Sequence, residues 1–287
     1  MTRIRTVAVL PTMFTLANLV CGFFAIVVAS RIDAPVSVEV QSAAEIHTSR
    51  AVPQLDRDDP AHNMMLCGWL IFLAMVFDAL DGHVARLAKT SSDFGAQLDS
   101  LCDVVSFGVA PAILLVKMCP TFSFLHREAI WIIAASFAAC AALRLARFSI
   151  ETGENENHMH FSGLPSPAAA ASIAGFAILF YTLRKENNQM PYAADLDSWI
   201  QNILPAYAVL IGVLMVSRIP YPHIVNQTLR GQHSFGHVVT LVFAFVAVMV
   251  IQGYSVAVLC CAFVVGPPVR YFWLRFVRRE VQQEPLF

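Results

Sequence analysis

The chain has 287 residues, of which 57% are hydrophobic and only 14% are charged, and its mean hydropathy is +0.62. A water-exposed surface needs more charge than this, so the composition excludes an ordinary soluble protein. The formal net charge of −1 excludes the strongly basic surface that nucleic-acid binding requires.

The N-terminal part of the chain predicts a first membrane span followed by a long loop. Residues 1–5 are basic, and the apolar stretch over 7–29 is too long for the hydrophobic part of a typical signal peptide, which predicts a retained span. The polar segment 31–63 holds six carboxylates, and we expect it to form an outer loop. Its acidic cluster at 56–59 is interpreted as a solvated face rather than a cation site.

Seven further apolar stretches approach the roughly 20 residues that a helix needs to cross a bilayer, although two of them are short. They predict an all-α, polytopic membrane helix bundle with six core transmembrane helices and a C-terminal hairpin, about eight spans in all. Residues 1–236 would form the core, and residues 237–287 would form the hairpin and a basic tail. We expect residues 184–200 to form a second outer loop. The stretches lie at 64–82, 99–119, 129–147, 165–183, 202–217, 237–252 and 254–273.

Lys and Arg predict the orientation of the bundle, because cytoplasmic segments carry an excess of positive charge. With the N-terminus inside, the inner segments hold 12 of the 19 Lys and Arg residues and the outer segments hold 7. This bias predicts that both termini are cytoplasmic.

Four aspartates occur at helical spacing where one predicted span ends and the next begins. Asp78 and Asp81 are three residues apart, and Asp99 and Asp103 are four apart. In a helix each pair shares one face, with Cβ atoms about 5–6 Å apart. Ionised carboxylates in a bilayer are costly and normally mark a functional site. The predicted orientation places both pairs at the cytoplasmic edge.

The charge balance of this segment predicts a metal site. Arg86 and Lys89 are too few to neutralise the four aspartates, and Asp93 adds a fifth carboxylate. One or two divalent cations would resolve the imbalance, and oxygen ligands suit Mg²⁺, Mn²⁺ or Ca²⁺. The alternative, aspartates that only cap helices or face water, fits a single Asp78 better than a set of four.

Neighbouring residues suggest a phosphate-containing ligand. Gly82 and Gly95 have no side chains, so a bulky group can approach the backbone there. Arg86 lies four residues after Gly82, and its guanidinium can bind a phosphate through two hydrogen bonds. Together with metal these residues predict a pyrophosphate site, although helix packing would explain either glycine alone.

The spacing D-x-x-D-G-x-x-A-R-x₈-G-x-x-x-D-x-x-x-D, from Asp78 to Asp103, resembles the signature of the CDP-alcohol phosphotransferase family in every fixed position. The resemblance implies six core helices, usually a homodimer, and two divalent cations, Mg²⁺ or Mn²⁺. It implies that Asp78, Asp81 and Asp99 ligate metal and that Asp103 is the general base and a further ligand. The CDP pocket would be lined by Thr15, Asn18, Asp81, Gly82, Ala85, Arg86 and Gly95.

Four further segments are similar to the membrane-embedded phosphatidylserine synthases of bacteria and archaea. The resemblance implies transfer of the phosphatidyl group of CDP-diacylglycerol to L-serine, with release of CMP. It also implies an integral protein of a prokaryotic plasma (inner) membrane, in contact with membrane lipid, with a cytoplasmic active site. Thr12 departs from the pattern, since many relatives are expected to have asparagine there, and the outer loop 31–63 would be an insertion relative to the family. The segments are residues 106–112, 142–148, 161–170 and 215–222.

Arg144 and Arg147 lie three residues apart near the cytoplasmic end of the fourth span. They could bind a serine carboxylate or a lipid phosphate, or anchor the span to anionic headgroups.

Other functions stay open from the sequence. The acceptor could be glycerol 3-phosphate, inositol phosphate or choline, the last favouring aromatic walls. A metal-ion transporter would place its charged site near the middle of the bilayer rather than at its edge. His233 and His237 have the spacing of a metal pair, but no cysteine or carboxylate lies near them to complete a zinc site.

Overall fold

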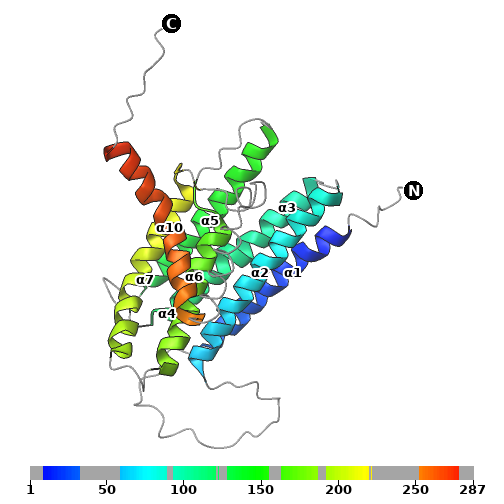
Figure 1. Ribbon diagram of the computed structural model, residues 1–287. Coiled ribbons are helices and arrows are strands. Elements are labelled where there is room, and N and C mark those ends of the chain that lie inside the picture. Colours follow the sequence, from blue (N-terminus) through cyan, green and yellow to red (C-terminus); the bar gives the residue numbers. More distant parts are fainter. Residues whose placement is uncertain are drawn as a thin grey trace, which may run out of the picture.

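The computed structural model describes residues 9–32, 59–88, 93–120, 122, 128–154, 163–186, 192–219, 221 and 252–277. Every regular element in this part of the chain is a helix, and the helices pack side by side as a bundle (Figure 1). The predicted all-α class is confirmed. The helices are α1 (Val9–Ser30), α2 (Pro60–Ala88), α3 (Asp93–Asp103), the π-helix η3 (Val104–Val109), α4 (Ala110–Met118), α5 (Ala129–Glu154), α6 (Ser166–Glu186), α7 (Ala193–Val216) and α10 (Gln252–Val277).

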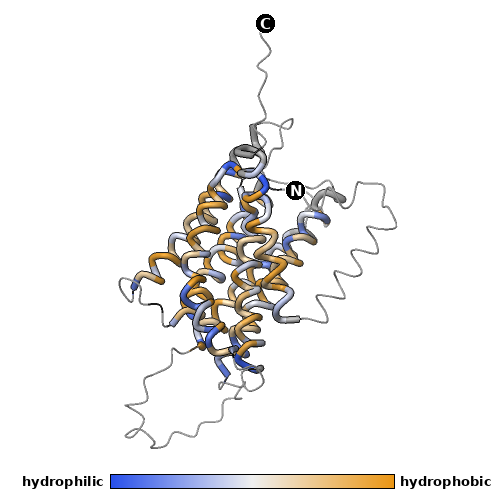
Figure 2. The backbone as a smooth tube through the Cα atoms, turned by 60° about the vertical axis from the view of Figure 1, so that its left-hand side comes forward, coloured by the Kyte–Doolittle hydropathy of each residue, from blue (hydrophilic) through white to orange (hydrophobic). Residues whose placement is uncertain are grey.

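Seven segments within the described residues are long and apolar enough to cross a membrane. Hydrophobic residues predominate along the lengths of the helices, while hydrophilic residues gather toward their ends (Figure 2). The chain is therefore an integral membrane protein. The predicted span at 237–252 lies outside the described residues. The seven segments are Thr12–Ser30, Pro60–Val84, Phe94–Met118, Ala129–Ser149, Ser166–Lys185, Ala193–Val216 and Gly253–Tyr271.

The end of the bundle at which α2 ends and α3 begins is called the site end here. The first residues of α1 and the last residues of α5, α7 and α10 lie at the same end, which is the upper one in Figure 1. Backbone hydrogen bonds from Gly163 to Ile219 (2.9 Å) and from Leu164 to Leu214 (3.0 Å) hold the start of α6 against the end of α7. Segments distant in the sequence, at the start of α6 and the end of α7, therefore meet at the site end.

Helix α6 lies at the centre of the bundle and packs against α2, α7 and α10. In its membrane-spanning window 72% of the residues are buried, against 22% in that of α10. Small residues permit this, since a Cβ added to Gly68 of α2 would lie 2.9 Å from the Ala174 carbonyl oxygen. Ala169 and Ala170 are fully buried. Association between membrane helices depends on such close contact, because lipid provides no hydrophobic driving force between them.

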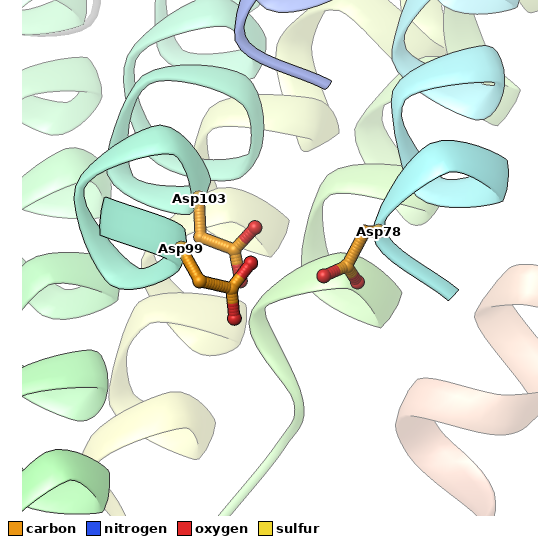
Figure 3. Close-up of side chains that lie close together, drawn as sticks. All are labelled: Asp78, Asp99 and Asp103. Carbon is orange, nitrogen blue, oxygen red and sulfur yellow. The ribbon is translucent and has the colours of Figure 1, made fainter. Parts of the chain in front are cut away.

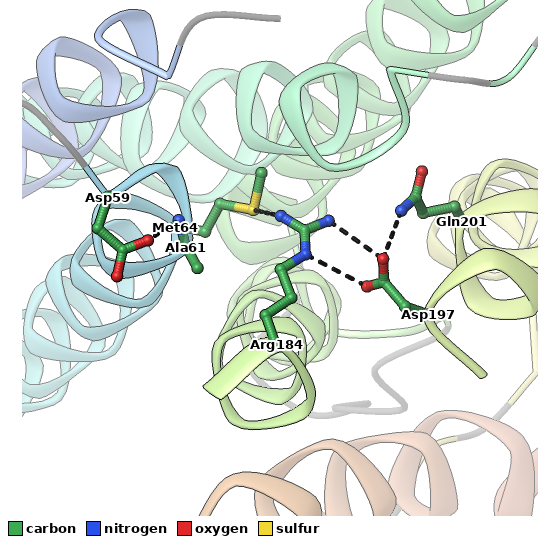
Figure 4. A network of polar contacts seen from close by, with 6 residues as sticks. All are labelled: Asp59, Ala61, Met64, Arg184, Asp197 and Gln201. Atoms are coloured by element: carbon green, nitrogen blue, oxygen red, sulfur yellow. Dashed lines mark hydrogen bonds and ion pairs between the residues drawn. The ribbon is translucent and has the colours of Figure 1, made fainter. Parts of the chain in front are cut away.

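The predicted outer loop over residues 184–200 is wrong in its extent, because α6 continues to Glu186 and α7 begins at Ala193. The polar residues that suggested a loop pair with one another at the end opposite the site (Figure 4). Arg184 Nε lies 3.4 Å from Asp197 Oδ1, and Gln201 Nε2 donates to Asp197 Oδ2 at 2.9 Å. Paired in this way, these side chains are compatible with helices.

The start of α2 explains one member of the acidic cluster. Asp59 Oδ1 accepts a hydrogen bond from the Ala61 backbone N–H at 2.9 Å, which caps the helix, and Pro60 at its first position needs no N–H partner. Asp59 is thus a helix cap. Asp56 and Asp58 lie outside the described residues.

Tyr221, which follows α7, forms a hydrogen bond to the backbone of α10. Pro268 lacks an N–H, so the carbonyl of Val264, four residues earlier, loses its helical partner. The Tyr221 hydroxyl donates to that carbonyl at 2.9 Å. Burial raises the pKa of Tyr221 to about 12, so the phenol keeps its proton at neutral pH.

Candidate metal and nucleotide site

Three of the four predicted aspartates meet at the site end. One carboxylate oxygen each from Asp78, Asp99 and Asp103 lie within 4.8 Å of one another. Figure 3 shows Asp99 and Asp103, on successive turns of α3, facing Asp78 on α2. Asp103 is buried and the other two are half-buried. Asp99 and Asp103 share one face of α3, as their spacing of four residues predicted.

Asp81 is not part of this group of three, although it lies near it. Its side chain is buried and interacts electrostatically with Asp99 and Asp103, and it hydrogen-bonds to Thr15 of α1. Its Oδ2 atom and Asp99 Oδ1 are buried and have no hydrogen-bond partner among the described residues. Buried acceptors without partners are costly, so something outside the protein is expected to satisfy them.

These residues fit a divalent cation. The ligand set consists of carboxylate oxygens, which are the ligands that Mg²⁺ and Mn²⁺ prefer. Two of those oxygens are buried and accept no hydrogen bond from the described residues. Like charges at this separation repel one another strongly unless a cation lies between them.

The two predicted arginines have different surroundings. Arg144 interacts electrostatically with Asp78 and Asp103, and its Nη1 donates to the hydroxyl of Ser166, the first residue of α6, at 2.6 Å. Arg147 Nη1 donates instead to the carbonyl of Val216, the last residue of α7, at 3.0 Å. The end of a helix leaves carbonyls unpaired, so Arg147 caps α7. Ser166 lies in the segment 161–170 that resembles the phosphatidylserine synthases, but sequence analysis gave it no role of its own.

Helix α1 packs against both α2 and α3, which brings its two predicted nucleotide ligands to the aspartates. Thr15 bonds to Asp81, as described above. The Asn18 side-chain amide donates to Asp103 Oδ1 at 3.0 Å, and the Ser106 hydroxyl donates to the Asn18 backbone carbonyl at 3.0 Å. Sequence analysis assigned no role to Ser106.

A π-helix, η3, begins directly after Asp103 and was not predicted. A π-helix fits an extra residue into the turn, so it changes which residues face a given neighbour, and it is frequent at functional sites. Here Ser106 faces α1, while Gly108 packs on α5, where an added Cβ would lie 3.4 Å from Ala141 Cβ. Asp99 and Asp103 keep the α-helical spacing before it.

Gly82, one of the predicted pocket residues, borders open space in the described structure. A Cβ added there would meet no described atom within 4 Å. Ala85 and Arg86 lie in the last turn of α2, but their side chains are outside the described part of the structure. Gly95 lies in the first turn of α3.

Gly82→Leu is expected to reduce CDP binding at least tenfold while the protein remains folded, because the added side chain occupies open space beside the carboxylates. Isothermal titration with CDP and a thermal melt in detergent measure the two effects. Gly266→Leu is the matched control, since Gly266 in α10 also faces open space within the described structure. Equal CDP affinity in both variants would contradict a pocket at Gly82.

The fold and the site together define an integral membrane protein with a carboxylate cluster at one end of its helices. A family model described as CDP-alcohol phosphatidyltransferase matches residues 8–214. The chain belongs to this family, as the aspartate spacing predicted.

Relatives named CDP-diacylglycerol–serine O-phosphatidyltransferase include one from Methanocaldococcus jannaschii, 43% identical over 158 residues, or 55% of this chain and 64% of the relative. A second, from Helicobacter pylori, is 35% identical over 163 residues, 57% of this chain and 63% of the relative. An archaetidylserine synthase from Methanothermobacter thermautotrophicus is 36% identical over 160 residues, 54% of this chain and 57% of the relative. The chain thus spans less than two thirds of the length of each of these relatives.

Proposed function

We propose that the protein transfers the phosphatidyl group of CDP-diacylglycerol to the hydroxyl of L-serine, giving phosphatidylserine and CMP. The observation that carries the proposal is the meeting of Asp78, Asp99 and Asp103 within 4.8 Å. Family membership and the names of the relatives support the donor and the acceptor.

The proposed metal ligands are Asp78, Asp81, Asp99 and Asp103, and the proposed cofactors are two divalent cations, Mg²⁺ or Mn²⁺. When bound, such cations would offset the charge of the pyrophosphate and polarise the phosphorus that is attacked. The nucleotide would lie against Gly82, Ala85, Arg86 and Gly95, with Thr15 on its α1 side.

Asp103 is the proposed general base. It accepts the proton of the serine hydroxyl as that oxygen bonds to the lipid-side phosphorus. The bond from this phosphorus to the CMP oxygen breaks, and CMP leaves with the electron pair. Asp103 is the most enclosed of the three clustered aspartates, with 7% of its surface exposed, so its proton transfer is sheltered from bulk water.

Arg144 is the proposed ligand of the serine carboxylate. It interacts with Asp78 and Asp103, and Ser166 holds its guanidinium in place. A guanidinium can bind a carboxylate through two parallel hydrogen bonds. Arg147 is used in capping α7, so we assign it a structural role.

The site end is proposed to face the cytoplasm of a prokaryotic cell, and the protein is proposed to act as a homodimer in the inner membrane. The position of the aspartates at the end of α2 and the start of α3 suits a substrate with a soluble nucleotide and a lipid tail. It fits a transporter less well, because transporters bind their cargo near the middle of the bilayer.

An acceptor panel tests this function. Purified protein with CDP-diacylglycerol and Mn²⁺ is given serine, ethanolamine, glycerol 3-phosphate, inositol phosphate or choline, and CMP release is measured. We expect release with serine and at least tenfold less with ethanolamine, which lacks only the carboxylate, and Arg144→Gln should remove this difference. Faster release with another alcohol would refute serine as the acceptor. Mn²⁺ uptake into vesicles without CMP release would favour a transporter.

A further inference from the structure

Asn18 makes a buried hydrogen bond between α1 and α3 that the proposed chemistry does not yet use. The residue has no exposed surface, and its Nδ2 donates to Asp103 Oδ1 at 3.0 Å across 85 residues of sequence. The other atom of the amide, Oδ1, is buried without a hydrogen-bond partner among the described residues. The bond to Asp103 is thus the side-chain interaction that the structure gives Asn18.

The direction of the amide follows from chemistry. An ionised carboxylate only accepts hydrogen bonds, so the NH₂ group must face Asp103, and the opposite orientation would set two oxygens against each other. The side chain therefore serves as a donor to the carboxylate.

The backbone at Asn18 is held as firmly as the side chain. The Ser106 hydroxyl donates to the Asn18 carbonyl at 3.0 Å. One turn further along α1, a Cβ on Gly22 would lie 2.8 Å from Ser106 Cα, so glycine is required for the two helices to approach this closely. Gly22, Ser106 and Asn18 form a chain of contacts that ends at Asp103.

We propose that Asn18 is a positioning residue for Asp103. Its amide fixes one carboxylate oxygen, Oδ1, and so directs the other toward the hydroxyl of the acceptor alcohol. Rotation of the carboxylate would otherwise spread its oxygens over several directions, and a displacement of about 1 Å at a reacting group can cost on the order of 10²-fold in rate. This inference rests on the proposed role of Asp103 as the base.

A positioning role and a nucleotide-binding role for Asn18 predict different kinetics. Loss of positioning lowers kcat and leaves the binding of CDP-diacylglycerol unchanged, because the base acts only in the chemical step. Loss of a nucleotide contact raises KM and weakens the binding of CDP. A double variant of Asn18 and Asp103 separates the two roles further. If Asn18 acts through Asp103, the effects of the two substitutions on kcat do not add.

The test compares Asn18→Ala with Asn63→Ala in the purified full-length protein, using the most active alcohol of the panel. Asn63 is also buried but lies in the first turn of α2, at the opposite end. We expect Asn18→Ala to lower kcat about 10- to 100-fold, with KM for CDP-diacylglycerol and calorimetric CDP affinity within about twofold of wild type. It should cause no further loss in an Asp103→Asn background. Asn63→Ala should keep the wild-type kcat.

Asn18→Leu removes the donor while keeping the number and branching of the side-chain heavy atoms, so it replaces the alanine variant if the latter has a lowered melting temperature. An unchanged kcat in the folded variant would overturn the inference. A loss of CDP affinity in Asn18→Ala would also overturn it, if the double variant with Asp103→Asn shows the sum of the two single losses. Failure of the proposed function shows differently, as a wild-type protein that releases no CMP with any alcohol of the panel.

Discussion

Asp103→Asn is expected to lower alcohol-dependent CMP release by about 10²–10⁴-fold, the usual contribution of a general base. Asparagine has the shape of aspartate, and its carbonyl oxygen can still accept the hydrogen bond from Asn18, so the local structure should persist. It cannot take the proton of the acceptor hydroxyl. Turnover is measured as CMP release, and binding as calorimetric affinity for CDP.

We expect binding of the CDP-lipid to stay measurable in this variant. Asp195→Asn is the control, because Asp195 is exposed in the first turn of α7, at the opposite end of the bundle. Wild-type turnover in Asp103→Asn would end the assignment of the base. A parallel loss in Asp195→Asn would show that the assay responds to any change of charge.

Asp99→Asn is expected to abolish most of the activity and to weaken Mn²⁺ binding strongly, because it removes one carboxylate of the cluster. In the metal-free protein the same substitution is expected to stabilise the fold rather than to weaken it. There it removes a charge that repels both Asp78 and Asp103, so the melting temperature in EDTA should rise.

Melting temperatures with and without Mn²⁺ measure both effects. A ligand present at 100 times its Kd stabilises the folded state by about 2.7 kcal/mol, so wild type should gain clearly from Mn²⁺ and Asp99→Asn should gain little. Electron paramagnetic resonance of Mn²⁺ gives the affinity directly. An equal rise in melting temperature for both proteins would refute the cluster as the metal site.

The aspartate cluster could be predicted from the sequence because it depends on local geometry. Spacings of three and four residues in helices place Asp78 and Asp81 on one face, and likewise Asp99 and Asp103. Because ionised carboxylates are costly in a bilayer, the four aspartates were then predicted to belong to one functional site. The closer grouping of three, with Asp81 bound to Thr15, depends on how α1 lies between the helices, which spacing alone does not define.

The features that sequence analysis missed arise from contacts between distant segments. The π-helix η3 occurs where Ser106 contacts the backbone of α1. Asp197 lies in α7 rather than in the predicted loop, and it pairs there with Arg184 of α6. Arg144 and Arg147 could not be distinguished from the sequence, yet only Arg147 hydrogen-bonds to the end of α7. Periodicity does not predict such long-range partners.

The central position of α6 determines where the protein can be altered without harm. Replacing a buried alanine of this helix, such as Ala169, Ala170 or Ala174, with a larger residue would push neighbouring helices apart, and overpacking typically costs about 1–3 kcal/mol. Positions such as Met13 of α1, Trp131 of α5 and Val258 of α10 face outward, being 64%, 57% and 68% exposed in the described structure. Spectroscopic probes and cross-linkers therefore belong on these outward-facing positions, and α6 should be left unmodified.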